Sequence, residues 1–242
     1  MRIALISDIH GNLVSLETTL ADIAQRGVDE IICLGDVATL GAQPNEVIDR
    51  LQGLGCRTVM GNHDSFLIGK DDITHYTDEA AVVKMVAWCM GKMSTAELDY
   101  LRTFVPLLEV PLADDVSMLC FHGSPRSNTE VILAKTPDDK LEKALAGHRA
   151  TIMAGGHTHI QMLRRYFDTL IVNPGSVGAP FWEMPPVGRL KILPWVEYGI
   201  VEWKAGQLNV ELLRLPIDLA AVQGAIMASD MEEPEQWLAY WD

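Results

Sequence analysis

The chain has 242 residues and a formal net charge of −14, from 19 Lys and Arg against 33 Asp and Glu. This length allows one large domain or two small ones. The acidic balance, with no basic face visible, argues against a binder of duplex nucleic acid, and the absence of any apolar run of about eighteen residues argues against a membrane span.

The first part of the chain alternates apolar strands with amphipathic helices. Arg2 to Ser7 reads as a buried strand and Leu13 to Arg26 as a helix, and Glu30 to Leu34 is a second strand. A helix over Pro44 to Leu54 and a strand over Arg57 to Met60 follow. This order predicts a parallel sheet with crossover helices.

The segment from about 71 to 105 departs from this repeat. Asp78 to Phe104 predicts two helices broken near Gly91, and Ser94 and Glu97 have the spacing of a capping box for the second helix. We therefore expect a small helical insert beside the strand ends. Its large apolar residues suit either the lining of a substrate pocket or ordinary packing, which is the commoner role: Met85, Trp88, Met90 and Met93.

The remainder predicts more strands, with helices near residues 136 and 217. Thr136 is the expected N-cap of the first of these helices. No internal repeat or linker is visible, so we expect a single domain over residues 1–242, in which the hairpin and helix of residues 190–242 complete the fold. The expected strands are 107–111, 116–121, 150–154, 162–167, 170–172, 196–203 and 208–213.

The four cysteines show no CxxC spacing, and two of them lie inside apolar strands. This usage fits buried thiols in a reducing compartment. The chain starts with a short strand that leads directly into polar residues, unlike a signal peptide, so we expect a cytoplasmic protein.

Polar side chains follow five of the strands, at the end where each strand finishes. In extended backbone, residues i and i+2 point to the same side, so Asp8 and His10 are expected to reach one point. Ligands of open α/β sheets gather beyond the carboxyl ends of the strands. The five clusters are Asp8 and His10; Asp36; Asn62, His63 and Asp64; His122; and His157 and His159.

Seven of these side chains are candidate metal ligands. A single catalytic zinc needs three protein ligands, so the number favours two ions. A bridging carboxylate would hold two ions ~3.5–4 Å apart, the spacing used for in-line displacement at phosphorus. The donors are oxygen and nitrogen only, which suits Mn, Fe, Zn, Co or Ni. The seven are Asp8, His10, Asp36, Asn62, His122, His157 and His159.

The order and spacing of these motifs across residues 1–178 resemble those of the calcineurin-like metallophosphoesterases. The matching segments are Asp8-x-His10, Gly35-Asp36, Gly61-Asn62-His63-Asp64, His122 and Gly156-His157-x-His159. Three further segments resemble the small bacterial and archaeal phosphodiesterase branch, which is similar to diadenosine tetraphosphatases: Asn12, Ser124-Pro125-Arg126 and Asn173-Pro174-Gly175-Ser176-Val177.

The resemblance implies an α/β fold, a four-layer αββα sandwich of two mixed β-sheets flanked by helices. It implies two divalent or trivalent transition-metal ions per chain, with Mn or Fe favoured, and a metal-bridging hydroxide that attacks the phosphorus of a small phosphoester. It also implies how the ligands divide: Asp8, His10 and His159 on one metal, Asn62, His122 and His157 on the other, and Asp36 as the bridge.

His63 and Asp64 are the catalytic residues that the resemblance implies. His63 would stabilise the transition state or protonate the leaving oxygen. Asp64 would orient His63, as a carboxylate behind an imidazole does. The same carboxylate also suits the N-terminus of a helix.

Four residues are candidates for contact with the substrate. Asn12 follows the first motif. Arg126 offers a bidentate fork for phosphate, or a surface ion pair. Phe181 and Trp182 suit stacking on a base or an aromatic leaving group, or packing under the hairpin that starts near Trp195. The residues after Asp36, Val-Ala-Thr-Leu-Gly, lack the arginine of Ser/Thr protein phosphatases, which argues against that activity.

Two functions remain open at this stage. The first is dinuclear-metal hydrolysis of a phosphodiester or phosphomonoester of a small molecule or nucleotide. The alternative is a non-catalytic scaffold or regulatory protein on the same fold, like the retromer subunit that resembles this family. The presence of all seven ligands and of His63 favours the enzyme. The natural substrate, the preference for mono- or diesters, the native metal and the oligomeric state are left open.

Overall fold

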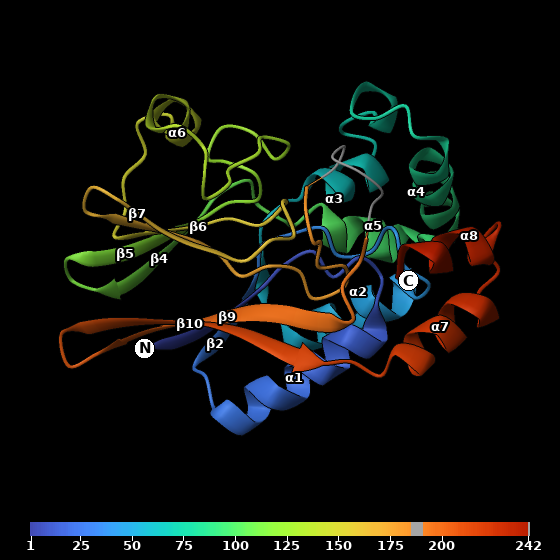
Figure 1. Ribbon diagram of the computed structural model, residues 1–242, viewed down its shortest axis with the longest axis horizontal. Helices are drawn as coiled ribbons and strands as arrows, with labels where there is room; N and C mark the ends of the chain where they lie inside the picture. Colours follow the sequence, from blue (N-terminus) through green and yellow to red (C-terminus); the bar gives the residue numbers. More distant parts are fainter. Residues whose placement is uncertain (185–190, 242) are drawn as a thin grey trace.

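The computed structural model describes residues 1–184 and 191–241. Two five-stranded sheets lie face to face, with helices on their outer sides (Figure 1). The expected αββα sandwich of two mixed sheets is therefore confirmed.

The first sheet has the strand order β10-β9-β1-β2-β3. The parallel strands β1, β2 and β3 alternate with helices α1 and α2, whose bounds are those expected. β9 runs antiparallel to β1 and makes the sheet mixed. The elements are β1 (Arg2–Ile6), α1 (Leu13–Arg26), β2 (Glu30–Cys33), α2 (Pro44–Leu54), β3 (Arg57–Thr58), β9 (Trp195–Lys204) and β10 (Gln207–Pro216).

The second sheet has the order β4-β5-β6-β8-β7, with parallel central strands and antiparallel edges. Helix α6 lies before β6. Its N-cap is Pro137 and not Thr136, because the Thr136 hydroxyl instead accepts a hydrogen bond from Leu133 N. The elements are β4 (Leu108–Ala113), β5 (Val116–Cys120), α6 (Asp138–Leu145), β6 (Ile152–Ala154), β7 (Met162–Tyr166) and β8 (Thr169–Asn173).

The apolar core lies in two main layers. Between the sheets, Ile3 and Leu5 of β1 pack with Val110 and Met118 of the second sheet. On the outer face of the first sheet, α1 and α2 bury their apolar stripes. Burial on both faces explains why the central strands read as continuous apolar runs.

The helical insert follows β3. Ser94 and Glu97 form the expected capping box of α5. Met85 is buried and Trp88 half-buried against the C-terminal helices, and not in a pocket at the strand ends. Met90 is exposed. The helices of the insert are η1 (Ile73–His75), α4 (Ala80–Lys92) and α5 (Thr95–Leu101). Helix α3 (Asn62–Leu67) precedes the insert, and the C-terminal helices are α7 (Leu219–Ala228), α8 (Pro234–Leu238) and η2 (Ala239–Trp241).

The C-terminal part contributes to two regions. Strands β9 and β10 extend the first sheet, and the last helices pack beside α4 (Figure 1). Residues 190 and 242, the limits expected for this part, lie outside the described residues. Among the residues that are described, no helix has the length and apolar character needed to cross a membrane.

Candidate metal centre

All seven predicted metal ligands come together at one edge of the sandwich. They lie just beyond the carboxyl ends of β1, β2, β3, β5 and β6. Each is at most 5% exposed. A buried cluster of carboxylates and imidazoles at this density needs counter-charges or metal ions to offset its desolvation.

The backbone at these ligands is not extended. β1 ends at Ile6, and Asp8 and His10 have φ angles of 53° and 48°. Asp36, His157 and His159 also lie in the left-handed region. The reasoning from an extended strand is therefore wrong for Asp8 and His10, although both side chains do reach one point. Such conformations persist only where the surroundings enforce them, and they concentrate at functional sites.

Hydrogen bonds between neighbouring turns enforce this conformation. The Asp8 N–H donates to Gly35 O at 2.9 Å, and the His10 N–H donates to Asp36 O at 3.1 Å. The turn after β1 is thus held by the turn after β2. The left-handed ligands depend on tertiary contacts, which local sequence patterns do not encode.

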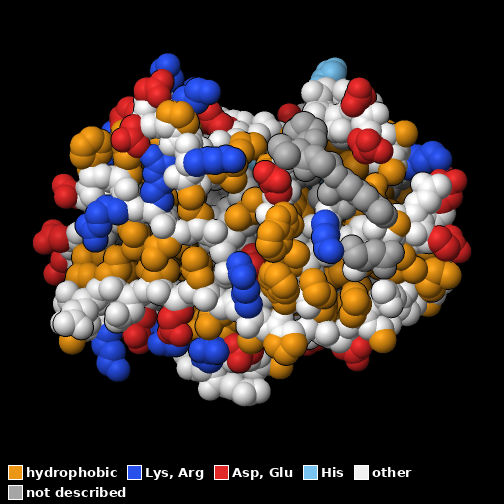
Figure 2. All heavy atoms as spheres, in the orientation of Figure 1, with side chains coloured by type: hydrophobic (Ala, Val, Ile, Leu, Met, Phe, Trp, Pro, Cys, Tyr) orange, Lys and Arg blue, Asp and Glu red, His pale blue; other side chains and the backbone are white. Residues whose placement is uncertain are grey.

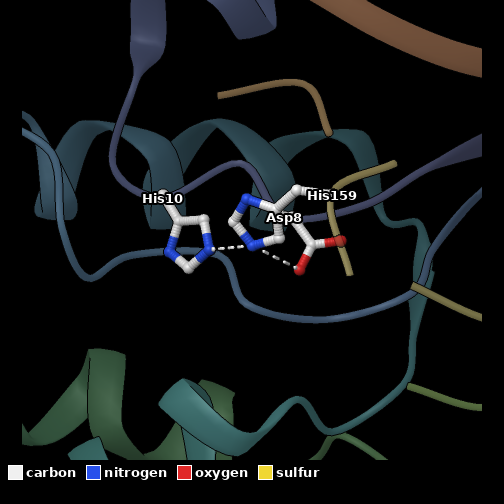
Figure 3. Close-up of side chains that lie close together, drawn as sticks. All are labelled: Asp8, His10 and His159. Carbon is white, nitrogen blue, oxygen red and sulfur yellow. Dashed lines mark hydrogen bonds and ion pairs between the residues drawn. The ribbon is translucent and has the colours of Figure 1, made fainter. Parts of the chain in front are cut away.

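The first ligand group joins Asp8, His10 and His159 (Figure 3). His159 Nε2 lies 3.1 Å from His10 Nε2 and 3.3 Å from Asp8 Oδ1. Figure 3 shows the three side chains converging from two separate stretches of chain. One carboxylate oxygen and two imidazole nitrogens therefore face a common point.

The second group joins Asp36, His122 and His157, with Asn62 alongside. His122 Nε2 lies 3.2 Å from Asp36 Oδ2 and 3.1 Å from Asn62 Oδ1. The same Asp36 Oδ2 is 3.9 Å from His10 Nε2 of the first group. A single carboxylate oxygen thus lies between the two ligand groups.

Backbone carbonyls orient the histidine rings from behind. Nδ1 of His10, His122 and His159 hydrogen-bonds to Thr39 O, Leu34 O and Ala179 O at 3.1, 2.7 and 2.6 Å. His157 is reversed, because its Nε2 hydrogen-bonds to Thr129 O at 3.1 Å. A ring nitrogen that donates outward leaves the other nitrogen of a neutral imidazole as a lone pair, here aimed at the centre.

These orientations fit bound cations. The Nε2 lone pairs of His10 and His159 face each other at 3.1 Å, an arrangement that is repulsive unless a cation lies between them. Asp8 Oδ1 is buried and accepts no hydrogen bond from any residue that the structure describes. Such a buried anionic oxygen is costly when unpaired, and metal coordination would satisfy it. The donor set therefore suits transition-metal ions.

The pKa values reflect the same crowding. Burial, together with neighbouring imidazoles, lowers the pKa of His10 and of His157 to about 3, so both are neutral, as metal ligands must be. Burial favours a neutral Asp36, but the facing imidazoles of His122 and His63 hold the pKa of that carboxyl well below its usual range. Burial likewise opposes the charge on His122, but Asp36 outweighs it and raises the pKa of His122 to about 10, so that a bound metal ion would have to displace a proton from this ring.

His63 lies at the border of the first group. Its ring centre is 5.2 Å from that of His10, edge to face, and its backbone N–H donates to Asp36 Oδ1 at 2.8 Å. Burial lowers the pKa of His63. Its Nδ1 is buried and has no hydrogen-bond partner among the described residues.

Asp64 contacts backbone groups of two turns. Its carboxylate accepts the backbone N–H groups of Gly61, Asp36 and Val37 at 2.9, 2.8 and 2.9 Å. It therefore caps the start of α3 and fixes the turn that carries Asp36. No hydrogen bond joins this carboxylate to the buried His63 Nδ1 among the described residues, so any positioning of His63 by Asp64 acts through the turn and stays a prediction. Burial and the charge of Asp36 raise the pKa of Asp64 to about 7.

Two of the predicted substrate residues have structural partners. Asn12 is the N-cap of α1, accepting from Ser15 N at 3.0 Å, and it donates to Gly178 O at 3.1 Å. Arg126 is exposed and forms an ion pair with Glu130. The surface pair weighed for Arg126 is thus the arrangement present.

The two aromatic candidates for substrate contact, Phe181 and Trp182, lie in different surroundings. Phe181 stacks on the ring of His159, with centroids 4.1 Å apart and planes 18° apart. It pairs with Ile192 and packs near the C-terminal helices, not under the β9–β10 hairpin. Trp182 is 74% exposed. Phe181 therefore packs against a candidate metal ligand.

Tyr76 is a residue at the centre that sequence reasoning missed. It follows η1 in the insert, and its ring lies 6.5 Å from that of His63 and 6.3 Å from that of His157. Burial and the charges of Asp36 and Asp8 raise the pKa of Tyr76 to about 12. Its position in the insert was the only sequence feature that could have indicated a place near the centre, because no motif includes Tyr76.

Comparisons with known proteins agree with this arrangement. Residues 1–192 match the calcineurin-like phosphoesterase superfamily domain. An uncharacterised protein of Methanocaldococcus jannaschii is 30% identical over 195 residues, which cover 74% of this chain and 76% of that protein. A metallophosphoesterase structure from Sphaerobacter thermophilus has a TM-score of 0.75 and 25% identity, covering 99% of this chain and 98% of that chain.

A hypothetical protein from Pyrococcus horikoshii shares the fold, with a TM-score of 0.78 and 17% identity, covering 99% of this chain and 97% of that chain. Each of these likenesses spans most of both chains. The family match covers the whole set of predicted ligands, from Asp8 to His159. The chain therefore belongs to the calcineurin-like phosphoesterase superfamily.

Proposed function

We propose that this protein is an enzyme that uses two metal ions to hydrolyse phosphodiester or phosphomonoester bonds of small molecules or nucleotides. The main supporting observation is the position of Asp36 Oδ2, which lies 3.2 Å from His122 Nε2 and 3.9 Å from His10 Nε2. One oxygen between two ligand groups is the arrangement that a shared bridging carboxylate requires.

The ligand set divides between two ions. When bound, such ions supply Lewis acidity, which neutralises charge on phosphoryl oxygens and brings the pKa of water towards neutrality. Mn or Fe is favoured from the oxygen and nitrogen donors, with Zn, Co and Ni also suited. Asp8, His10 and His159 would hold one ion, Asn62, His122 and His157 the other, and Asp36 both.

His63 would act on the leaving oxygen. Its neutral imidazole carries one N–H, which can donate to the developing charge on that oxygen. The backbone contact between His63 N and Asp36 Oδ1 ties this side chain to the residue that joins the ligand groups. Asp36 would thereby position both the ions and the proton donor.

A small substrate is in keeping with the surface. Figure 2 shows Lys and Arg side chains scattered among Asp and Glu on the face in view, with no continuous basic area. A protein that binds a long polyanion needs several neighbouring cations for its phosphates. With a net charge of −14, the protein would attract metal ions more readily than nucleic acid.

The test is metal-dependent turnover. Chelator-stripped protein is assayed on bis-p-nitrophenyl phosphate and on p-nitrophenyl phosphate, with Mn²⁺, Fe²⁺, Zn²⁺, Co²⁺ or Ni²⁺ added back singly. We expect no turnover without metal, turnover with at least one ion, and two ions bound per chain. The ratio of the two rates distinguishes a diesterase from a monoesterase. A folded protein that binds two ions and hydrolyses neither substrate would contradict the proposal.

His63→Ala is expected to lower kcat by about 10²- to 10⁴-fold, the usual contribution of a positioned proton donor. The side chain is not in either ligand group, so two ions should still bind. The measurement is kcat with metal content determined on the same sample. His148→Ala, at a half-buried histidine beyond α6, is the matched control and should leave both unchanged. Full activity of the His63 variant would remove this residue from the mechanism.

A further inference from the structure

Tyr76 borders the metal centre from the helical insert. Its ring meets His63 at 78° with centroids 6.5 Å apart, and it meets His157 at 60° with centroids 6.3 Å apart. These two histidines come from different sheets of the sandwich, since one follows β3 and the other follows β6. Tyr76 therefore spans the gap between the proposed proton donor and the second ligand group.

The Tyr76 ring is in contact with a buried aromatic residue and is itself partly exposed to solvent. Phe66 of α3 lies 5.8 Å from it at 44° and also contacts His63, with centroids 5.4 Å apart. Phe66 is buried, whereas Tyr76 is 40% exposed. A large aromatic ring that is held at its edges and exposed beside a reactive centre offers a surface to a ligand.

The chemistry of hydrolysis places the leaving group beside His63. In hydrolysis, the phosphorus–oxygen bond to the leaving group breaks, and its oxygen gains a proton as water adds to phosphorus. A leaving oxygen that accepts the N–H of His63 must lie beside that ring. The group attached to this oxygen then lies near the aromatic rings that border His63, of which Phe66 is buried and Tyr76 is exposed.

Phe181, a further aromatic residue near the centre, is differently engaged. Phe181 lies flat on His159 at 4.1 Å, so one of its faces is already covered by a metal ligand. It also packs with the apolar cluster that includes Ile192. Tyr76 is consequently the better placed of the two for stacking on a bound molecule.

We propose that Tyr76 is a substrate-contacting residue that stacks on the leaving group and selects phosphoesters whose leaving group is a planar aromatic or a nucleoside. The inference rests on the proposed phosphoesterase function and adds a substrate class to it. A nucleoside or aryl leaving group gains the contact, whereas an alkyl leaving group does not.

The stacking role of Tyr76 can be tested by ligand binding alone, without turnover. Phenylphosphonate and methylphosphonate carry a phosphorus–carbon bond that the enzyme cannot hydrolyse, and their dissociation constants are measured by calorimetry on metal-loaded protein. We expect phenylphosphonate to bind the wild type about fivefold more tightly, the factor that one aromatic pair supplies. Tyr76→Ala should abolish the difference by weakening phenylphosphonate alone. Tyr76→Phe should keep it.

Kinetics and a control complete the test. Tyr76→Ala should raise the KM for bis-p-nitrophenyl phosphate about fivefold and change kcat little, since stacking is similar in ground and transition states. Phe167→Ala removes an aromatic ring that is 78% exposed on the second sheet, and should change neither quantity. Equal affinity of the wild type for the two phosphonates, absence of binding, or an unchanged ratio in Tyr76→Ala overturns the assignment.

Failure of the stacking role of Tyr76 can be distinguished from failure of the proposed phosphoesterase function. A protein that binds phenylphosphonate preferentially through Tyr76, but hydrolyses no ester with any metal, retains the stacking role and loses the enzymatic one. A protein that hydrolyses both nitrophenyl esters but shows no dependence on Tyr76 retains the enzyme and loses the stacking role.

Discussion

Asp36→Asn is expected to lower kcat/KM by about 10³-fold and to reduce the bound metal to one ion per chain or fewer. The Lewis acidity of bound ions contributes several kcal/mol to stabilisation of the transition state, and each 1.36 kcal/mol corresponds to about tenfold in rate. The variant removes the charge from the oxygen that lies between His10 and His122. The Asn side chain can also turn its N–H₂ group, which cannot bind a metal ion, towards the histidine nitrogens.

The measurement is metal content after dialysis, made together with turnover. Asp114→Asn, in the exposed turn between β4 and β5, is the matched control and should keep two ions and full activity. Thermal unfolding of the stripped proteins checks that the Asp36 variant is folded. Two tightly bound ions with wild-type turnover in that variant would exclude a bridging role for Asp36.

Gly178→Ala is expected to destabilise the protein by about 3 kcal/mol, the upper end for a side chain forced into a packed interior. A Cβ atom at this position would lie 1.8 Å from Ile9 O and 2.5 Å from Ile9 C. Neither backbone atom can move without shifting Asp8 and His10, so turnover should fall as well. Urea unfolding midpoints measure the loss of stability.

Gly53→Ala provides the opposite case. Gly53 lies on an exposed turn of α2, and a Cβ atom there would have no neighbour within 4 Å. Alanine in a helix is favoured over glycine by roughly 0.5–1 kcal/mol, so this variant should be slightly stabilised. If Gly178→Ala proved as stable as Gly53→Ala, the close approach of the loop after β8 to the first ligand turn would be refuted.

The parts of the fold that were predictable are those set by local periodicity. The bounds of α1 and α2 follow from their apolar stripes and are those expected. The convergence of the candidate ligands was predictable because each follows an apolar strand, and parallel strands bring the residues that follow them to one edge of the sheet. The capping box of α5 is likewise a short-range signal.

The parts that were not predictable depend on contacts between distant segments. The left-handed backbone of Asp8 and His10 is held by carbonyls that follow β2. The Asp64 carboxylate accepts backbone N–H groups from Asp36 and Val37, which lie 28 and 27 positions earlier in the chain. Tyr76 reaches the metal centre because the insert that carries it packs beside His63 and His157. No pattern within a short window encodes these arrangements.

The pairing of β1 with β9 has a consequence for how the chain acquires its structure. β1 lies in the middle of the first sheet, yet its antiparallel neighbour begins at Trp195, and their register joins Ile3 to Val201. During synthesis on the ribosome, one edge of β1 therefore has no partner until most of the chain has emerged. Contacts of such high sequence separation slow folding and leave strand edges open to aggregation. We therefore expect the nascent chain to be most prone to aggregation in this interval.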